Sequence, residues 1–301
     1  MPDIGALDAL RARLDALLPL REVLAATGYT ARKSLGQHFN LDRNLTDKIA
    51  ASARAAGADS NAPLAGQTVV EIGPGPGGLT RSLLRAGAEV IAVEKDPRAA
   101  AALAPVVEAA QGRLRLVIGD ALTADWTALA PEGAAICANL PYNVATPLIA
   151  GWLTGPWPPW WSSATVMVQR EVADRIVAET GADAYGRLAV LTGARAFATS
   201  LFDVSPAAFV PPPKVWSSVV RFDPRPDAAD VPVKTLERVT AAAFGQRRKM
   251  LRSSLKSLGE AEALLDAAGI AGNERAERVG VDGFIALARL VAARSESVAD
   301  R

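Results

Sequence analysis

Between residues 68 and 169, short apolar runs rich in β-branched residues alternate with stretches of helical spacing. This alternation predicts βα units and a mostly parallel sheet, which is an α/β fold. The predicted strands cover residues 68–72, 89–93, 114–118, 134–138 and 165–169. The turns after them carry Gly73, Glu94, Asp120, Asn139 and Arg170. Because the carboxyl ends of parallel strands share one edge of a sheet, we expect these residues to converge on one crevice.

Helical spacing also marks the beginning of the chain, where leucines recur at three- and four-residue steps, the period of an amphipathic helix. These are Leu7, Leu10, Leu14 and Leu17, with Leu18 beside the last. We expect this leader, residues 1–28, to dock on the body of the protein. Residues 31–40 are polar and basic and follow neither period. They predict an ordered loop before a helix that Asn44 can cap.

The pattern changes again near residue 210. The segment VPPPK at 210–214 cannot continue a helix or a central strand. Residues 216–222 predict one more strand, Pro224 and Pro226 indicate a linker, and helical spacing dominates from Lys234 onward. We therefore predict a helical leader over residues 1–28, a Rossmann-like sheet domain over 29–224 and a small C-terminal helical domain over 225–301.

Charge and composition narrow the classes of function. The 301 residues hold 33 Lys plus Arg against 32 Asp plus Glu, a net charge of +1, so any nucleic-acid surface has to be local. Cys137 is the only cysteine and His38 the only histidine, so we expect neither an internal disulfide nor a metal site. Prolines and asparagines interrupt the uncharged stretch between Glu132 and Arg170. We expect a soluble, cytoplasmic protein without a secretory signal or membrane span.

The first predicted strand runs into a glycine-rich turn, VVEIGPGPGG at 69–78, directly before a predicted helix. There Gly73, Gly75 and Gly78 have the G-x-G-x-x-G spacing, which in this context favours a nucleotide-like cofactor over an ordinary tight turn. Glu94 follows 21 positions after Gly73 at the end of the next strand. Its carboxylate can accept hydrogen bonds from both hydroxyls of a ribose, as nicotinamide and S-adenosylmethionine enzymes both require.

Two details favour S-adenosylmethionine over a dinucleotide. Pro74 and Pro76 offer no N–H donors to a pyrophosphate, and Glu71 is expected to add negative charge beside the loop. The cationic sulfonium and amino groups of S-adenosylmethionine tolerate nearby carboxylates. Asp120 is a suitable acceptor for an adenine amino group, although taken alone it can also be an ordinary helix-start acid.

The fourth predicted strand ends in ANLPYN at 138–143, whose residue types suit methylation of an exocyclic adenine nitrogen. That nitrogen is a poor nucleophile because its lone pair is delocalised into the ring. The Asn139 side-chain oxygen and the Leu140 carbonyl can accept the two amino hydrogens. Pro141 stiffens the backbone, and Tyr142 offers an aromatic face to a base removed from its helix. Alone, such a motif is as often only a turn, and its place after a strand favours catalysis.

Taken together, seven blocks resemble those of the ribosomal RNA adenine N6-dimethyltransferases, and specifically their small-subunit branch, the kasugamycin-sensitivity methyltransferases. In chain order the blocks are KSLGQHFN (33–40), EIGPG (71–75), VEKD (93–96), GD (119–120), NLPY (139–142), FVPPPKV (209–215) and FGQRRKMLR (244–252). The resemblance covers about residues 30 to 260. It implies an S-adenosylmethionine-dependent methyltransferase sheet with a helical C-terminal domain.

The resemblance also implies roles for particular residues. Residues that would contact S-adenosylmethionine are His38, Asn40, Gly73, Glu94, Asp120 and Asn139. Asn139, Leu140, Pro141 and Tyr142 would hold the target adenine, and Phe209 would stack on the face opposite Tyr142. The implied reaction is two methyl transfers to each of two adjacent adenosines in a hairpin near the 3′ end of small-subunit rRNA. The implied substrate is an immature 30S-type subunit, and we expect the enzyme to act as a monomer.

The chain departs from the family in its first block, which usually reads GQNFL and here reads GQHFN. His38 keeps a hydrogen-bonding side chain with a different reach and charge. The contact at Asn40 is expected to persist only if the family makes it through the backbone. Cys137 lies in an apolar run and is expected to fill the core.

A local run of positive charge supplies the expected RNA contact. A predicted helix carries five cations within ten consecutive residues, which are Arg247, Arg248, Lys249, Arg252 and Lys256. Such a run is usually a solvated face, and with the family resemblance we expect phosphate contacts instead. The tryptophans between residues 152 and 161 are expected mainly to wedge a proline-rich loop against the body.

Three other functions remain open at this point. A large-subunit methyltransferase that confers macrolide resistance has the same fold, although such relatives usually carry Ile at the position of Leu140. A ribosome-assembly factor could use the same surface without chemistry, which the complete set of Gly73, Glu94, Asp120 and Asn139 disfavours. A nicotinamide oxidoreductase is disfavoured by the prolines of the glycine loop.

Overall fold

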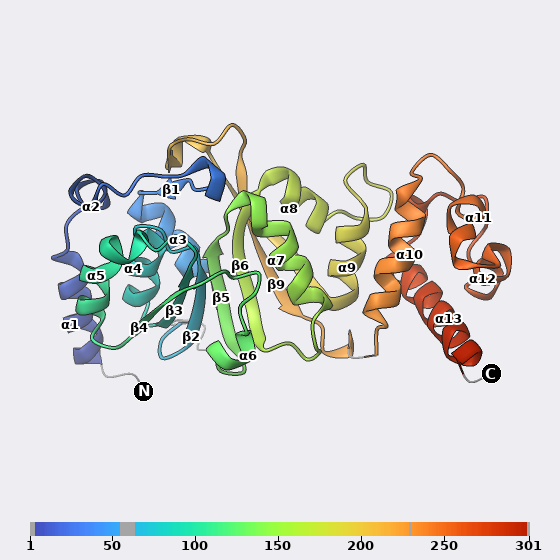
Figure 1. Ribbon diagram of the computed structural model, residues 1–301, viewed down its shortest axis with the longest axis horizontal. Helices are drawn as coiled ribbons and strands as arrows, with labels where there is room; N and C mark the ends of the chain where they lie inside the picture. The colour runs from blue at the N-terminus through green and yellow to red at the C-terminus, as the bar shows by residue number, and fades with distance from the viewer. Residues whose placement is uncertain (1–3, 55–63, 229, 300–301) are drawn as a thin grey trace. The chain divides into compact units, whose positions relative to one another are not determined.

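The computed structural model describes residues 4–54, 64–228 and 230–299, and Figure 1 shows the order of its elements. The chain forms two compact units. Unit 1 contains the described residues of Met1–Leu148, Trp160–Ala173 and Thr199–Asp223. Unit 2 contains those of Ile149–Pro159, Asp174–Ala198 and Pro224–Arg301. Unit 2 thus draws on two segments upstream of residue 224, whereas the sequence pattern indicates a single boundary there.

The centre of unit 1 is a seven-stranded sheet in the order β4-β3-β2-β5-β6-β9-β7. Its strands are β2 (Thr68–Ile72), β3 (Glu89–Glu94), β4 (Leu114–Ile118), β5 (Ala134–Asn139), β6 (Trp161–Gln169), β7 (Ala196–Val204) and β9 (Ser217–Pro224). The pairs from β4 to β6 are parallel and β9 is antiparallel to β6. The predicted mostly parallel sheet is confirmed, and β6 begins four residues before its predicted start.

The order of the strands places the site. From β2 the chain moves outward through β3 to β4, and β5 then returns to the other side of β2. The strand order therefore reverses between β2 and β5. In open α/β sheets the crevice at the carboxyl ends of the two strands beside such a reversal binds ligands. The glycine-rich turn follows β2, and Asn139 ends β5.

The helices that begin in unit 1 surround this sheet. They are α1 (Ile4–Asp15), α2 (Leu20–Thr27), α3 (Arg43–Ser52), α4 (Gly78–Arg85), α5 (Ala99–Ala110), α6 (Trp126–Leu129), α7 (Tyr142–Thr154) and α8 (Arg170–Ile176). Helix α1 packs against α4 and α5 (Figure 1). Its Leu10 and Leu14 are fully buried in the main core. The predicted docking of the leader is confirmed, although Leu18 remains 55% exposed.

Three local features differ from the sequence prediction. The loop over residues 31–40 contains the 3₁₀ turn η1 (Lys33–Leu35) and the short strand β1 (Phe39–Asn40). Strand β1 pairs with β8 (Phe209–Val210), which joins segments about 170 residues apart. The predicted cap Asn44 is wrong, because Asp42 is the N-cap of α3 and its side chain accepts the N–H of Asn44. An Asp two residues earlier fits capping equally well, so composition alone could not separate them.

Unit 2 is helical. Besides the end of α7 it contains α9 (Arg187–Arg195), α10 (Val233–Gly245), α11 (Leu251–Ser254), α12 (Ala261–Ala267) and α13 (Val281–Ala299). Its core includes Tyr185, Leu236 and Phe284. The predicted helix under the basic run is confirmed only in part: residues 246–250 form a turn between α10 and α11, whereas Arg252 lies on α11. Within residues 4–54, 64–228 and 230–299, no helix is both long and apolar enough to cross a membrane.

Candidate active site

One cavity opens at the carboxyl edge of the sheet in unit 1. Its lining includes Gly73, Glu94, Asp120, Asn139 and Tyr142, and thus joins the ends of β2, β3, β4 and β5. The predicted convergence of these strand ends on one crevice is confirmed. Arg170, the residue after β6, is absent from the residues that line the cavity.

The glycine-rich turn forms one wall of the cavity with its N–H groups already in use. The Gly73 N–H donates to the Val93 carbonyl at 2.9 Å, and the Gly77 N–H donates to the Pro74 carbonyl at 2.9 Å. The Gly75 N–H donates to Oε2 of Glu94 at 3.2 Å. Because these donors are satisfied within the protein, the turn has little to offer a pyrophosphate. This geometry supports a cofactor without phosphate.

Gly75 occupies a position where a side chain does not fit. Its φ is +54°, in the left-handed region that favours glycine. A Cβ there would lie 3.2 Å from Cδ1 of Phe39. Strand β1 therefore packs directly on the turn, and the turn keeps its shape only with glycine.

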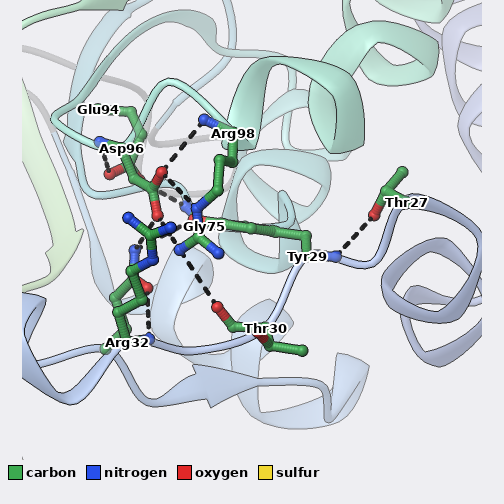
Figure 2. Close-up of polar contacts among 9 residues, drawn as sticks. Thr27, Tyr29, Thr30, Arg32, Gly75, Glu94, Asp96 and Arg98 are labelled. Carbon is green, nitrogen blue, oxygen red and sulfur yellow. Dashed lines mark hydrogen bonds and ion pairs between the residues drawn. The ribbon is translucent and has the colours of Figure 1, made fainter.

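Glu94 ends β3 and is 5% exposed. Its Oε1 accepts the Asp96 N–H at 2.9 Å while Oε2 accepts the Gly75 N–H (Figure 2). Burial raises the pKa of Glu94 above its ordinary value, and the two backbone hydrogen bonds oppose that shift. The carboxylate is thus fixed in place beside the turn.

A polar cluster next to Glu94 ties the chain after α2 to the end of β3. Figure 2 shows the segment from Thr27 to Arg32 lying beside Asp96 and Arg98. The Arg98 Nε donates to Oδ1 of Asp96 at 2.9 Å, and its Nη2 donates to the Thr30 carbonyl at 3.3 Å. The Arg98 bond holds the pKa of Asp96 below its usual value. Gln37, from the first motif block, donates to Asp96 at 3.3 Å.

Glu71 corrects one expectation. It lines the cavity but is 1% exposed, and its Oε2 accepts the Thr80 hydroxyl at 2.7 Å. Burial raises the pKa of Glu71 to about 8, against the opposing effect of the Thr80 hydrogen bond. Glu71 is therefore mostly protonated at neutral pH, and the predicted negative charge beside the loop is wrong for this state of the protein. Its burial could not be read from the motif.

Asp120 reaches the cavity from the turn after β4 and has a partner that the sequence did not indicate. The Lys95 ammonium donates to Oδ2 of Asp120 at 2.7 Å, and Oδ1 accepts the Leu122 N–H at 3.0 Å. The Lys95 hydrogen bond lowers the pKa of Asp120. Asp120 is ionised, and one of its oxygens is shared with an exposed lysine.

Asn139 and Leu140 lie where β5 meets α7. The Asn139 Nδ2 donates to the His38 carbonyl at 3.4 Å, which orients the amide and leaves its Oδ1 as an acceptor. The Leu140 N–H donates to the Met167 carbonyl of β6 at 3.2 Å. Pro141 begins the turn into α7, where its carbonyl accepts the N–H groups of Val144 and Ala145. The sheet and the helix thus hold this bend from both sides.

Tyr142 forms the opposite end of the cavity. Its hydroxyl lies 2.6 Å from Oγ of Ser217, at the start of β9. Burial raises the pKa of Tyr142, so the phenol stays neutral. The His38 ring lies beside it, with centroids 5.4 Å apart and planes tilted by 30°. The His38 Nδ1 is 2.8 Å from the Pro211 carbonyl oxygen.

Five predicted site residues are not among those that line the cavity. Phe209 is 2% exposed, belongs to the main core and is not among the residues that line the cavity. The aromatic ring next to Tyr142 is His38, and stacking of Phe209 on the target adenine stays a prediction. The predicted RNA-contact residues Arg247, Arg248, Lys249 and Arg252 are exposed and belong to unit 2. The Arg247 Nη2 donates to the Asp183 carbonyl at 2.6 Å.

S-adenosylmethionine fits the residues that are present. Asn40 lines the cavity with a buried Nδ2 that has no hydrogen-bond partner among the described residues, while its Oδ1 accepts the Asp42 N–H. An unpartnered buried donor suits a carboxylate, such as that of a methionine group. Glu94 and Asp120 can accept from ribose hydroxyls and an adenine amino group. The departure at Asn40 therefore adds a side-chain donor where we expected only a backbone contact.

The strand order reverses beside the cavity, the glycine turn has few free N–H donors for a phosphate, and two carboxylates lie at strand ends. Together these features define an S-adenosylmethionine-dependent methyltransferase. Residues 28–293 match the family model described as "Ribosomal RNA adenine dimethylase", so the chain belongs to that family. This confirms the family resemblance, the fold class, the enzyme class and the cofactor that the sequence indicated.

Individual proteins similar to this chain agree with the family assignment. A "Ribosomal RNA small subunit methyltransferase A" of Xanthobacter autotrophicus is 57% identical, over 93% of this chain and 96% of its own. A protein of the same name from Azorhizobium caulinodans is 58% identical, over 91% and 93%. Among solved structures, the 23S rRNA methyltransferase ErmE is 26% identical with a TM-score of 0.63, over 84% and 99%. A dimethyladenosine transferase from Plasmodium falciparum, at 23% identity and a TM-score of 0.67, over 84% and 97%, shows the same fold.

Sequence reasoning missed three residues that shape the site: Lys95, Ser217 and Gln37. Lys95 and Gln37 lie inside motif blocks whose neighbours were assigned, so their membership was a usable signal. Ser217 lies at the start of the strand predicted over residues 216–222. Nothing in the sequence around it indicates a contact with Tyr142, 75 residues away.

Proposed function

We propose that this protein dimethylates N6 of two adjacent adenosines in the 3′-terminal hairpin of small-subunit rRNA, within an immature 30S-type particle. The observation that carries the proposal is one cavity that joins the Asn139-to-Tyr142 bend to the glycine turn, Glu94 and Asp120. A cofactor site and an adenine-suited bend thus share one space. The protein would act in the cytoplasm as a monomer.

The bend accounts for activation of the target nitrogen. The Oδ1 of Asn139 and the carbonyl of Leu140 accept the two amino hydrogens, which makes the lone pair of N6 more available. Tyr142, held by Ser217, presents its ring to the base. Bound S-adenosylmethionine supplies an electrophilic methyl group on a sulfonium. The methylated nitrogen is acidic enough to lose its proton to water, so these residues act mainly by alignment.

The residues at the other end of the cavity would hold the cofactor. Glu94 would accept the ribose hydroxyls, Asp120 the adenine amino group, and the Nδ2 of Asn40 would donate to the carboxylate. Gly73 and Gly75 allow close approach of the backbone. His38 and Asn139 complete the predicted contacts, linked through the His38 carbonyl.

The names of the similar proteins favour the small subunit over the large subunit as the substrate. Proteins 57–58% identical over most of the chain are named for the small subunit, whereas ErmE, named for 23S rRNA, is 26% identical. Arg247, Arg248, Lys249 and Arg252 would contact phosphates of that RNA, because they are exposed cations in one turn and its neighbouring helix.

Mass mapping of methylated nucleotides tests the proposal. Small subunits from cells that lack this methylation are incubated with the protein and labelled S-adenosylmethionine. We expect dimethyladenosine at the two adjacent positions near the 3′ end and nowhere else. Label in 23S rRNA instead would support the large-subunit alternative, and no label in any rRNA would reject the enzyme assignment. Size-exclusion chromatography with light scattering tests the monomer.

A further inference from the structure

Near the Tyr142 end of the cavity, the segment 210–216 that leads into β9 carries three exposed apolar side chains, none of which is among the residues that line the cavity. Val210, Val215 and Trp216 are 40%, 44% and 47% exposed. All six tryptophans lie in the described part of the chain, and Trp216 alone among them is exposed. Exposed apolar side chains that gather near a functional site can mark a binding surface.

The place of Trp216 follows from its neighbours. Ser217, the next residue, is fully buried and its Oγ lies 2.6 Å from the Tyr142 hydroxyl. In the sheet Ser217 pairs with Gln169, the last residue of β6. The Trp216 carbonyl accepts the Arg170 N–H at 2.9 Å, which fixes the backbone one residue beyond that pair. Since side chains alternate along extended backbone, a buried Ser217 directs the neighbouring Trp216 indole to the opposite side of the chain, where it is exposed.

The charges around Trp216 suit a polyanion. Lys214 is exposed, and the Arg170 side chain is 56% exposed. Arg170 is 3.8 Å from Asp203, an exposed and weak pairing that leaves most of its guanidinium to solvent. An exposed aromatic face between cations is the arrangement with which proteins bind unpaired nucleotides. A protein partner would be expected to cover the exposed apolar side chains without using these cations.

We propose that Trp216 is a stacking platform for the base of a nucleotide adjacent to the target adenosine. This inference rests on the proposed function. A target adenine at Tyr142 has to leave its stack, and its neighbour in the RNA then loses a stacking partner as well. The indole of Trp216, one residue from the group that holds Tyr142, replaces that partner. Trp216 is thus a positioning residue that selects an unpaired RNA strand.

Steady-state methylation of undermodified small subunits tests the proposal. For Trp216→Ala we expect KM for the subunit to rise about 5- to 150-fold, the range equivalent to 1–3 kcal/mol for base–aromatic stacking. The kcat and the Kd for S-adenosylhomocysteine should stay within twofold. Trp216→Phe should have a KM close to that of the unaltered protein, because it keeps an aromatic face. A KM within twofold of the unaltered protein for Trp216→Ala would overturn the proposal.

Trp126 is the matched control. It lies on α6, just before β5, and therefore at the amino edge of the parallel sheet, where it stacks on Trp160 with centroids 5.4 Å apart. Trp126→Ala should leave KM for the subunit unchanged. An equal rise in KM for both alanine variants would show that loss of a tryptophan acts through stability, and the proposal would fail.

Fluorescence distinguishes RNA from a protein partner. A single-stranded RNA with two adjacent adenosines should quench tryptophan emission of the unaltered protein, and Trp216→Phe should abolish most of that quenching. Quenching that persists in Trp216→Phe overturns the proposal. A rise in KM for whole subunits with no quenching by RNA alone would assign Trp216 to a ribosomal protein instead, which also overturns it. No methylation by the unaltered protein would reject the proposed function and this inference with it.

Discussion

The two ends of the cavity are built differently. At the cofactor end, Glu94 is 5% exposed and both of its oxygens accept backbone N–H groups. At the target end, Tyr142 has one hydroxyl contact, His38 lies beside it and Trp216 stands open to solvent. A small ligand of constant shape is matched by a fixed, buried frame, whereas an RNA strand needs an accessible surface. The comparison predicts that changes at the first end alter cofactor affinity, whereas changes at the second alter binding of the subunit or methyl transfer to it.

Asn139 lies between the two ends and should give the largest effect. Asn139→Ala removes the oxygen that we propose accepts an amino hydrogen of the adenine. We expect kcat to fall about 100- to 1,000-fold, as for loss of one preorganised hydrogen-bonding group, while binding to the subunit is retained. Single-turnover methylation measures this. Asn44→Ala, an exposed asparagine on α3, is the control. A kcat reduced less than threefold would remove Asn139 from catalysis and favour an assembly role.

Glu71 makes the cofactor end sensitive to alkali. Its pKa is about 8 in the folded protein and near 4.5 when exposed, so the folded state binds one more proton between those values. The contribution of Glu71 to stability is therefore fully present below pH 4.5 and is lost as pH rises through about 8, by on the order of 3 kcal/mol from pH 5 to pH 8. Glu71→Gln can still accept the Thr80 hydroxyl and should lack this loss.

Urea unfolding at pH 5 and pH 8 measures the difference. At pH 5 the two proteins should be similar, and at pH 8 Glu71→Gln should be the more stable. Parallel losses in both proteins would mean that another group controls the slope.

Glu94 should affect cofactor binding alone. Glu94→Ala is expected to weaken S-adenosylhomocysteine binding by about 1–3 kcal/mol, since it removes the two charge-assisted hydrogen bonds that we propose Glu94 accepts from the ribose. Burial raises the pKa of Glu94, and the carboxylate has to be ionised to accept both hydroxyls. Affinity of the unaltered protein should therefore fall on acidification, and Glu94→Gln should lose that dependence. Calorimetry over a pH series measures both, and an unchanged Kd would exclude the ribose role.

Lys95 should give the smallest effect, in the opposite direction. It occupies one oxygen of Asp120 through an exposed ion pair. Lys95→Ala frees that oxygen for the adenine amino group, so we expect S-adenosylhomocysteine to bind up to about fivefold tighter, within the 0.2–1 kcal/mol of such pairs. Lys256→Ala, in unit 2, is the control. Weaker binding by Lys95→Ala would show that the lysine itself contacts the cofactor.

Much of unit 1 could be predicted because its signals are local. The five runs from residue 68 to 169 are short, apolar and bounded by turns, and parallel strands have only one edge at which Gly73, Glu94 and Asn139 can meet. The family blocks then supplied the chemistry. The leader was also predictable, because its leucine spacing identifies the buried face of a helix.

What failed depended on contacts between distant segments. Strand β1 is two residues long and exists only because β8, far along the chain, pairs with it. The ring beside Tyr142 is His38, whereas Phe209 is buried in the core, so its stacking on the target adenine stays a prediction. The protonation of Glu71 depends on complete burial, which a motif does not record. Helical periodicity likewise misassigned the turn that carries Arg247.

The leader helices have a practical consequence for anyone who shortens this protein. The family match begins at residue 28, yet Leu10 and Leu14 are fully buried and the Leu18 carbonyl accepts a hydrogen bond from Arg81 on α4. A version trimmed to the matched residues would lose about 1.5–3 kcal/mol for each leucine. It would also expose apolar surface on α4 and α5. We therefore expect the trimmed protein to precipitate rather than to yield a minimal enzyme.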